Sequence, residues 1–164
     1  IAYVSEDRLS LGVNLKQSVA DNISVTVIDK LAKMGFVAPE RRRDLASDWV
    51  DRLNIKTAST AAAVQTLSGG NQQRVVLAKW LAAKPKVLIL DGPTVGVDIR
   101  NKQGIYEIIR GLARDGMAIL LISDEVDEVY FNCDRVLHMR GGHIAGEYVP
   151  GAVAETVLRE AVYA

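Results

Sequence analysis

The sequence predicts an α/β fold built on a parallel β-sheet. Short apolar runs of strand length alternate with longer amphipathic stretches, the pattern of parallel strands connected by helices. Residues 87–90 are continuously apolar and too few for a helix, as in a parallel strand covered on both faces. Asp91 follows directly, at the strand end where open α/β sheets bind ligands. The 164 residues are enough for one domain with its own hydrophobic core.

The composition excludes several classes of function. Twenty basic and twenty acidic residues leave no net charge, so nothing indicates a surface for nucleic acid or an anionic membrane. Cys133 is the only cysteine, which excludes an internal disulfide and is compatible with a reducing cytoplasm. No apolar run approaches the roughly 20 residues that span a bilayer, and we expect no signal peptide, because residues 1–4 have neither a basic start nor a cleavage pattern. Because the chain opens inside an expected strand without a methionine, we expect it to be a fragment.

The first third of the chain predicts one strand and two helices. Residues 1–4 are apolar enough for a buried strand, and a polar loop follows. Apolar residues at helical spacing predict a helix over residues 18–34 that ends at Gly35, despite several β-branched residues. Pro39 begins a second helix at its first position, with an apolar face and an exposed arginine run at 41–43.

Two glycines mark the start of the next helix. Ser68 precedes them and can cap this helix, since its hydroxyl can accept a hydrogen bond from a first-turn amide. Gly69 and Gly70 let the backbone approach a ligand without a Cβ in the way. The unpaired amides and the positive end of the helix dipole favour a phosphate there. The helix stops at Pro85.

The second half of the chain continues the alternation of helices and strands. The pattern predicts, in order, an amphipathic helix after Asp98 that ends at Gly116, a strand at 117–122, a short acidic helix to Phe131, a hairpin of residues 135–139 and 144–149, and a helix at 154–163.

Three segments together resemble the ATP-binding-cassette (ABC) ATPases. They are Leu67-Ser68-Gly69-Gly70-Asn71-Gln72-Gln73, which matches the family's signature motif; Val87 to Asp91, which is similar to its Walker B strand; and Val95-Gly96-Val97-Asp98, at the position of its D-loop. They occur in the family's order and spacing. The Asn-Gln-Gln and Gly-Val-Asp details are most similar to the second of two fused cassettes in importers of the ribose, galactose and xylose type.

The resemblance implies a P-loop NTPase fold, of which residues 1–164 would be a partial ABC ATPase domain. Residues 1–13 and 65–164 would form the α/β core. Residues 14–64 would form the helical subdomain, whose outer groove receives a short helix from the membrane permease. A phosphate loop needs Gly-x-x-x-x-Gly-Lys-Ser/Thr, and no glycine pair with this gap is followed by lysine. We therefore expect the main ATP-binding element to be missing from the chain.

The resemblance also implies ATP and Mg²⁺ as cofactors and assigns their residues by position. The implied residues are Ser68, Gly69, Gly70, Gln72, Asp98 and Glu6 for the nucleotide, Asp91 and Glu6 for the metal, and Asp91, Gly92 and Asp124 at catalytic positions.

Three of these residues depart from the family pattern. Gly92 replaces the general-base glutamate, Glu6 replaces the Q-loop glutamine, and Asp124 replaces the H-loop histidine. Loss of a general base typically costs about 10²- to 10⁴-fold in rate. The two added carboxylates would repel the triphosphate oxygens. The resemblance thus predicts that this cassette's own site is degenerate.

ABC cassettes pair head to tail, so the signature of one cassette completes the ATP site of the other. The resemblance implies an importer ATPase, peripheral on the cytoplasmic face of the membrane, whose signature face serves its partner. Expected partners are a second cassette, permease subunits through the helical subdomain and, indirectly, a periplasmic solute-binding protein, with no nucleic acid. The alternatives are a non-catalytic regulatory ABC module and a soluble ABC ATPase that acts on ribosomes. A chromosome-maintenance ATPase would need heptad arms that the sequence lacks.

Overall fold

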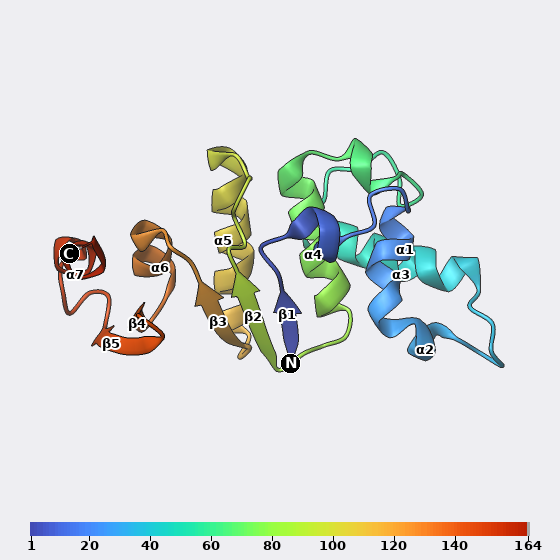
Figure 1. Ribbon diagram of the computed structural model, residues 1–164. Helices are drawn as coiled ribbons and strands as arrows, with labels where there is room; N and C mark the ends of the chain where they lie inside the picture. Colours follow the sequence, from blue (N-terminus) through green and yellow to red (C-terminus); the bar gives the residue numbers. More distant parts are fainter. Residues whose placement is uncertain (164) are drawn as a thin grey trace. The chain divides into compact units, whose positions relative to one another are not determined.

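A three-stranded sheet in the order β1-β2-β3 organises the fold (Figure 1). β1 (Ala2–Val4) and β2 (Val87–Asp91) pair in parallel, with Ala2 opposite Leu88 and Val4 opposite Leu90. α5 (Ile99–Arg114) connects β2 to β3 (Ala118–Ile122). The predicted α/β fold with a parallel sheet is confirmed.

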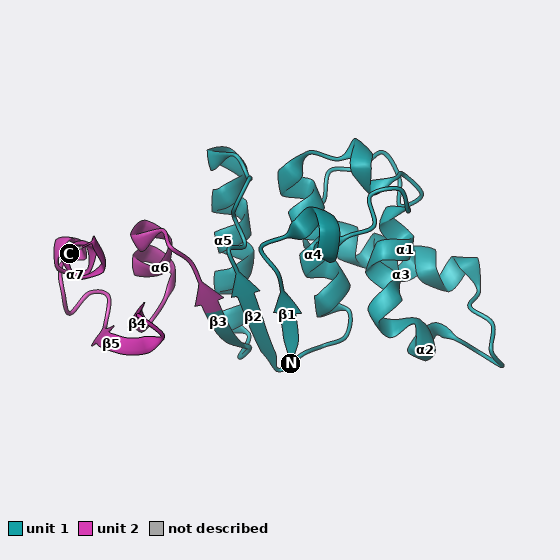
Figure 2. Cartoon of the chain, viewed as in Figure 1, with its two compact units in different colours: residues 1–120 teal, residues 121–164 magenta. Residues whose placement is uncertain are grey.

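The computed structural model describes residues 1–163, and Figure 2 shows its two units. Residues 1–120 form the first unit and residues 121–164 the second. No helix within residues 1–163 combines the length and apolar character that a membrane crossing requires. The assignment of residues 14–64 to a separate helical subdomain stays a prediction.

α4 (Gly69–Leu81) is the most deeply buried helix of the first unit, and it packs against β1, α1 (Val19–Ser24) and α5. Its apolar side is excluded from solvent because α1 and β1 flank it (Figure 1). The side chains with no solvent exposure are Val75, Val76, Leu77 and Ala78. α3 (Pro39–Arg52) packs in turn on α1 and begins at its proline, as predicted.

The prediction of one continuous helix over residues 18–34 is wrong. Its start is right, because the Ser18 hydroxyl accepts a hydrogen bond from the Asp21 amide at 3.0 Å. α1 then ends at Ser24 and is followed by a 3₁₀ turn, η2 (Val25–Val27), and by α2 (Ile28–Leu31). Val27 leaves the helical region at φ −131°. The β-branched side chains disfavour a helix here, and the Thr26 hydroxyl donates to the Lys79 carbonyl of α4 instead.

The sheet is covered on one face within residues 1–163. Leu88 and Leu90 have no solvent exposure, whereas Tyr3 is 47% exposed and Leu120 51% exposed. Successive side chains of a strand point to opposite faces, so these values distinguish a buried face from an open one. The prediction that residues 87–90 are covered on both faces is therefore wrong for the described chain.

The second unit contains the hairpin that the sequence predicts. β4 (Val136–Arg140) and β5 (His143–Tyr148) pair antiparallel around Gly141 and Gly142, whose φ angles of +57° and +80° favour glycine. α6 (Val126–Asn132) and α7 (Glu155–Tyr163) pack with this hairpin. Their shared apolar cluster is centred on Val126, Val136 and Leu158.

Candidate functional site

The first turn of α4 presents Ser68 at the surface, in the extended conformation of a residue that precedes a helix. The predicted capping bond from its hydroxyl is wrong. The Ser68 Oγ accepts instead from Asn71 Nδ2 at 2.9 Å, one turn along the helix. The Asn71 Oδ1 in turn accepts from the Lys56 amide at 2.8 Å, which ties the start of α4 to the segment after α3.

Gln72 is turned into the protein and is only 9% exposed. Its Nε2 donates to the Leu67 carbonyl at 3.1 Å and to the Val64 carbonyl at 3.4 Å. These bonds hold the 3₁₀ turn η3 (Val64–Thr66) against the start of α4. The structure thus gives Gln72 a local structural contact, and its contact with a nucleotide stays a prediction.

Residues 95–98 run beside the start of α4. A Cβ added to Gly69 would lie 3.4 Å from the Gly96 carbonyl oxygen and 3.4 Å from Arg8 Nη2, so these two segments are close neighbours. Arg8 also donates through Nη1 to the Val95 carbonyl at 3.5 Å. Burial lowers the pKa of this guanidinium, and its Nε has no hydrogen-bond partner among residues 1–163. The sequence analysis did not identify Arg8 as a site residue, although it lies two residues after Glu6 in the same polar loop.

Asp98 caps α5. Its carboxylate accepts from the Asn101 side-chain Nδ2 at 2.6 Å and from the Asn101 amide at 3.1 Å. These hydrogen bonds lower the pKa of the Asp98 carboxyl, because they favour its charged form. Asn101 is a second residue that the sequence analysis missed; its position three residues after a capping aspartate was the available signal.

A second group of site residues lies at the carboxyl end of β2. Asp91 accepts a hydrogen bond from the Tyr3 hydroxyl of the neighbouring strand at 2.7 Å, and this bond raises the pKa of Tyr3. Gly92 has a left-handed φ of +51°, and a Cβ added there would lie 3.0 Å from the Glu6 side chain and 3.0 Å from Val95. The structure therefore places Gly92, directly after Asp91, against the Glu6 side chain, and the roles of these three residues stay predictions.

The metal assignment rests on two carboxylates. Mg²⁺ bound with a nucleotide commonly takes one or two protein carboxylates and completes its shell with phosphate oxygens and water. Asp91 and Glu6 fit that role. In the part of the chain that is described, no cluster of three or more His, Cys, Asp or Glu side chains could hold a metal ion without such additional ligands.

Asp124 lies in the second unit, on the exposed turn that precedes α6. The neighbouring Ser123 hydroxyl donates to Glu128 and accepts from the Glu125 amide at 3.0 Å, which fixes the turn. The role of Asp124 beside a nucleotide stays a prediction.

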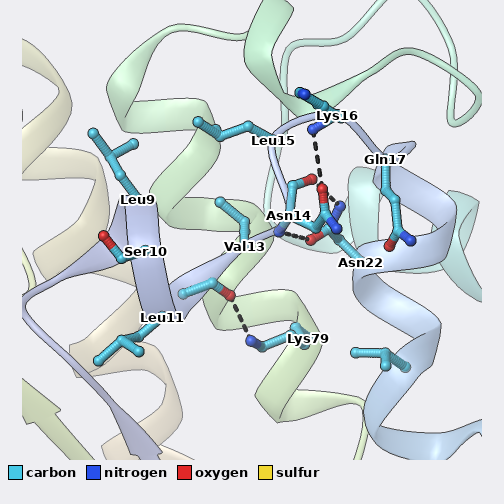
Figure 3. Close-up of a pocket in the computed structure, with 12 residues that line it drawn as sticks. Leu9, Ser10, Leu11, Val13, Asn14, Leu15, Lys16, Gln17, Asn22 and Lys79 are labelled. Atoms are coloured by element: carbon cyan, nitrogen blue, oxygen red, sulfur yellow. Dashed lines mark hydrogen bonds between the residues drawn. The ribbon is translucent and has the colours of Figure 1, made fainter.

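A surface groove of about 570 Å³ lies along residues 9–17, next to α1 and α4 (Figure 3). Its upstream wall is a π-helical turn, η1 (Arg8–Gly12). Buried Asn22 holds the loop: it accepts from the Asn14 amide at 2.7 Å and donates to the carbonyls of Asn14 and Ser18. Lys79 of α4 donates to the Gly12 carbonyl, and burial lowers the pKa of its ammonium. We call this feature the loop groove.

Comparison with known families adds to this geometry. The family described as ABC transporter matches residues 1–95. The ribose import ATP-binding protein RbsA of Geobacillus kaustophilus is 43% identical over 98% of this chain and 33% of its own length. RbsA 2 of Rubrobacter xylanophilus is 45% identical over 90% of this chain and 28% of its own length. The chain thus spans about a third of the length of these relatives.

Solved structures share the fold at lower sequence identity. The ATP-binding cassette MJ0796, a dimer in a post-hydrolysis state with ADP and phosphate, superposes with a TM-score of 0.74 at 22% identity, over 90% of this chain and 62% of that one. A metal-chelate type ABC transporter in an inward-facing conformation superposes with a TM-score of 0.79 at 18% identity, over 99% of this chain and 63% of that one. At these identities the likeness establishes the fold.

Proposed function

The chain belongs to the ABC transporter family, and from this premise we propose that it carries the signature face of the ATPase of a sugar importer. The ribose-import relatives suggest ribose or a similar sugar as the solute. One observation carries the proposal: the start of α4 and residues 95–98 lie side by side, with Ser68 exposed and with Arg8 and Gly96 no nearer than 3.4 Å to a Cβ built on Gly69. A phosphate that approached Gly69 would meet unpaired helix amides and the positive end of the α4 dipole.

The other half of the proposal is that the site at Asp91 is degenerate. Gly92 replaces the base, and its left-handed backbone and the adjacent Glu6 side chain leave no strain-free place for a larger residue. Tyr3 already donates to the Asp91 carboxylate. Mg-ATP at this site would meet the Asp91 and Glu6 carboxylates but no general base, so hydrolysis would depend on the partner site.

A second cassette is the proposed partner of the signature face. That cassette would supply the phosphate loop for the ATP that Ser68 and Gly69 contact. Two exposed apolar side chains next to this face support the pairing: Val95 is 45% exposed and Ile99 is 85% exposed. Burial of such side chains between cassettes would favour association.

The loop groove is the proposed docking site for a short helix of a permease subunit, which would hold this ATPase at the cytoplasmic side of the membrane. Leu9, Leu11 and Val25 line the groove and are 52%, 70% and 56% exposed. An amphipathic helix could cover these side chains with its apolar face. A periplasmic solute-binding protein would then act on this chain only through the permease.

ATP hydrolysis by the assembled transporter tests the asymmetry. Gly69→Glu would place a carboxylate where the phosphate must approach, and we expect turnover to fall at least about 100-fold. Asp91→Asn should reduce it less than about threefold, because it disables a site that lacks its base. Gly111→Glu is the matched control, since a Cβ at Gly111 meets nothing within 4 Å.

If Asp91→Asn proves more damaging than Gly69→Glu while both proteins remain folded, the proposed asymmetry is wrong. If neither variant changes turnover, the second candidate is favoured, a regulatory module without catalytic function. The departures from the family pattern at Gly92, Glu6 and Asp124 would agree with it. Solute uptake into vesicles, measured with the same variants, separates a loss of hydrolysis from a loss of transport.

A further inference from the structure

The starts of α4 and α5 meet at one unusually close contact. A Cβ built on Gly70 would lie 2.6 Å from both Cβ and Cγ of Asn101 and 3.1 Å from its Nδ2. Real Cβ atoms essentially never come within 3.0 Å of another heavy atom in this way, so even alanine at position 70 would require Asn101 or the helix to shift. In this chain, glycine at position 70 is therefore required by Asn101, independently of any ligand.

Asn101 cannot easily move away from this contact. Its side-chain Nδ2 donates to one carboxylate oxygen of Asp98 at 2.6 Å, and its backbone N–H donates to the other at 3.1 Å. A rotation of the side chain would break the shorter, charge-assisted hydrogen bond. Asn101 thus connects the carboxylate of Asp98 directly to the backbone of Gly70.

A reciprocal contact lies one turn further along both helices. The Arg74 guanidinium of α4 fills the space beside Gly104 of α5, where a Cβ would collide with it. The same guanidinium donates to the carbonyls of Leu53 and Asn54, at 2.8 and 2.9 Å. Each helix therefore inserts a side chain against a glycine of the other, which opposes both sliding and rotation at the crossing.

We propose that Asn101 is a positioning residue that makes the first turn of α4 and the loop ending at Asp98 move as one rigid body. The proposal rests on the proposed function, because this rigid body would close over the partner's ATP as a single surface. Signature and D-loop would then reach the nucleotide together, and a loosened link would misplace one relative to the other. Misplacement by an ångström lowers turnover much more than it lowers nucleotide binding.

Kinetics of the assembled transporter test the positioning role. Asn101→Ala keeps the Cβ that faces Gly70 and the backbone bond to Asp98 Oδ1, but it removes the side-chain hydrogen bond to Asp98 Oδ2. We expect kcat for ATP hydrolysis to fall about tenfold, with the KM for ATP changed less than about twofold. Asn101→Gln keeps the side-chain amide but adds one methylene group, so it should retain more of kcat than Asn101→Ala does. Equal changes in kcat and KM, or an unchanged kcat, would overturn the proposal.

A double-mutant cycle tests the contact itself. Gly70→Ala should lower kcat and the melting temperature in the original background but cost little further when Asn101→Gly has removed the colliding atoms. An equal loss in both backgrounds would mean that a ligand, not Asn101, requires the glycine, and would overturn the proposal. Melting temperatures report this coupling without any activity. A transporter that fails to hydrolyse ATP with the original sequence therefore refutes the proposed function separately from the contact.

Discussion

At the scale of single residues, two glycines of the candidate site are explained by side chains of the same chain. Gly70 accommodates Asn101, and Gly92 combines a φ of +51° with contacts to Glu6 and Val95 at 3.0 Å. A glycine in a nucleotide-binding motif is usually attributed to close approach of the ligand. Here the contact with Asn101 alone disfavours a larger residue at Gly70, and the left-handed backbone together with the tight contacts disfavours one at Gly92.

The geometry at Gly92 predicts that the missing base cannot simply be replaced. Gly92→Glu should not raise ATP turnover of the assembled transporter, since Glu6 adds a like charge and the backbone is strained. The chain should also lose about 1–3 kcal/mol of stability, measured by urea unfolding. Gly92→Ala is the control, because it imposes the strain without a carboxylate. A doubled rate in Gly92→Glu would show that the base was the only defect.

Cys133 should be chemically inert near neutral pH. Burial, with Asp134 and Glu128 nearby, raises the pKa of its thiol from 9.0 to about 11. The thiolate fraction at pH 8 should therefore be about 100-fold lower than for an unshifted thiol, and alkylation correspondingly slow. The rate should rise with pH until about pH 11, which mass spectrometry after timed iodoacetamide treatment can follow. Rapid alkylation at pH 7 would contradict the buried environment.

At the scale of elements, α4 connects the candidate nucleotide face to the loop groove. Its first turn contains Gly69 and Gly70, while Lys79 near its end supports the Gly12 carbonyl of the groove. A helix that is buried along its length transmits a displacement at one end to the other more readily than a loop does. The arrangement suits a subunit that links ATP to a membrane partner.

The loop groove should depend on one buried amide. Asn22→Ala removes an acceptor and both side-chain donor bonds to residues 14 and 18, and should cost about 1–3 kcal/mol in urea unfolding. Asn14→Ala is the matched control, since the Asn14 side chain accepts only an exposed bond from the Lys16 amide. That control should stay within about 0.5 kcal/mol of the original chain. An equal loss of unfolding free energy in the two variants would show that Asn22 has no special role in holding the loop.

At the scale of the whole molecule, the 164-residue chain should not bind ATP tightly by itself. Residues 1–164 contain no phosphate loop, and that loop normally supplies most backbone donors to the β- and γ-phosphates. Calorimetric titration with Mg-ATP should show no micromolar dissociation constant. The assembled transporter, titrated under the same conditions, provides the positive control. Micromolar binding by the isolated chain would mean that Asp91, Glu6 and their neighbours form a complete site.

The sequence by itself determined the α/β class, most element positions and the membership suggested by three motifs. These depend on local properties: the period of apolar residues, the proline that begins α3, and the glycines of the hairpin turn. The parallel direction of the strands followed from the same logic, because helices between apolar strands favour a parallel sheet, whereas the pairing of β1 with β2 came from the structure. The assignments of site residues by position stay predictions, although the structure brings several of them together.

Only the tertiary structure decided what those residues touch. Thr26 bonds to Lys79 of another helix where a continuous helix was expected, and the Ser68 hydroxyl bonds to Asn71 instead of a first-turn amide. Asn101 fills the space beside Gly70, and one face of the sheet stays open within the described residues. Most of these outcomes depend on segments tens of residues apart, and the Ser68 bond depends on a choice between two nearby donors. Periodicity and local propensity predict neither the contacts between distant segments nor the donor that Ser68 takes. They describe each segment alone, without the segments that pack against it.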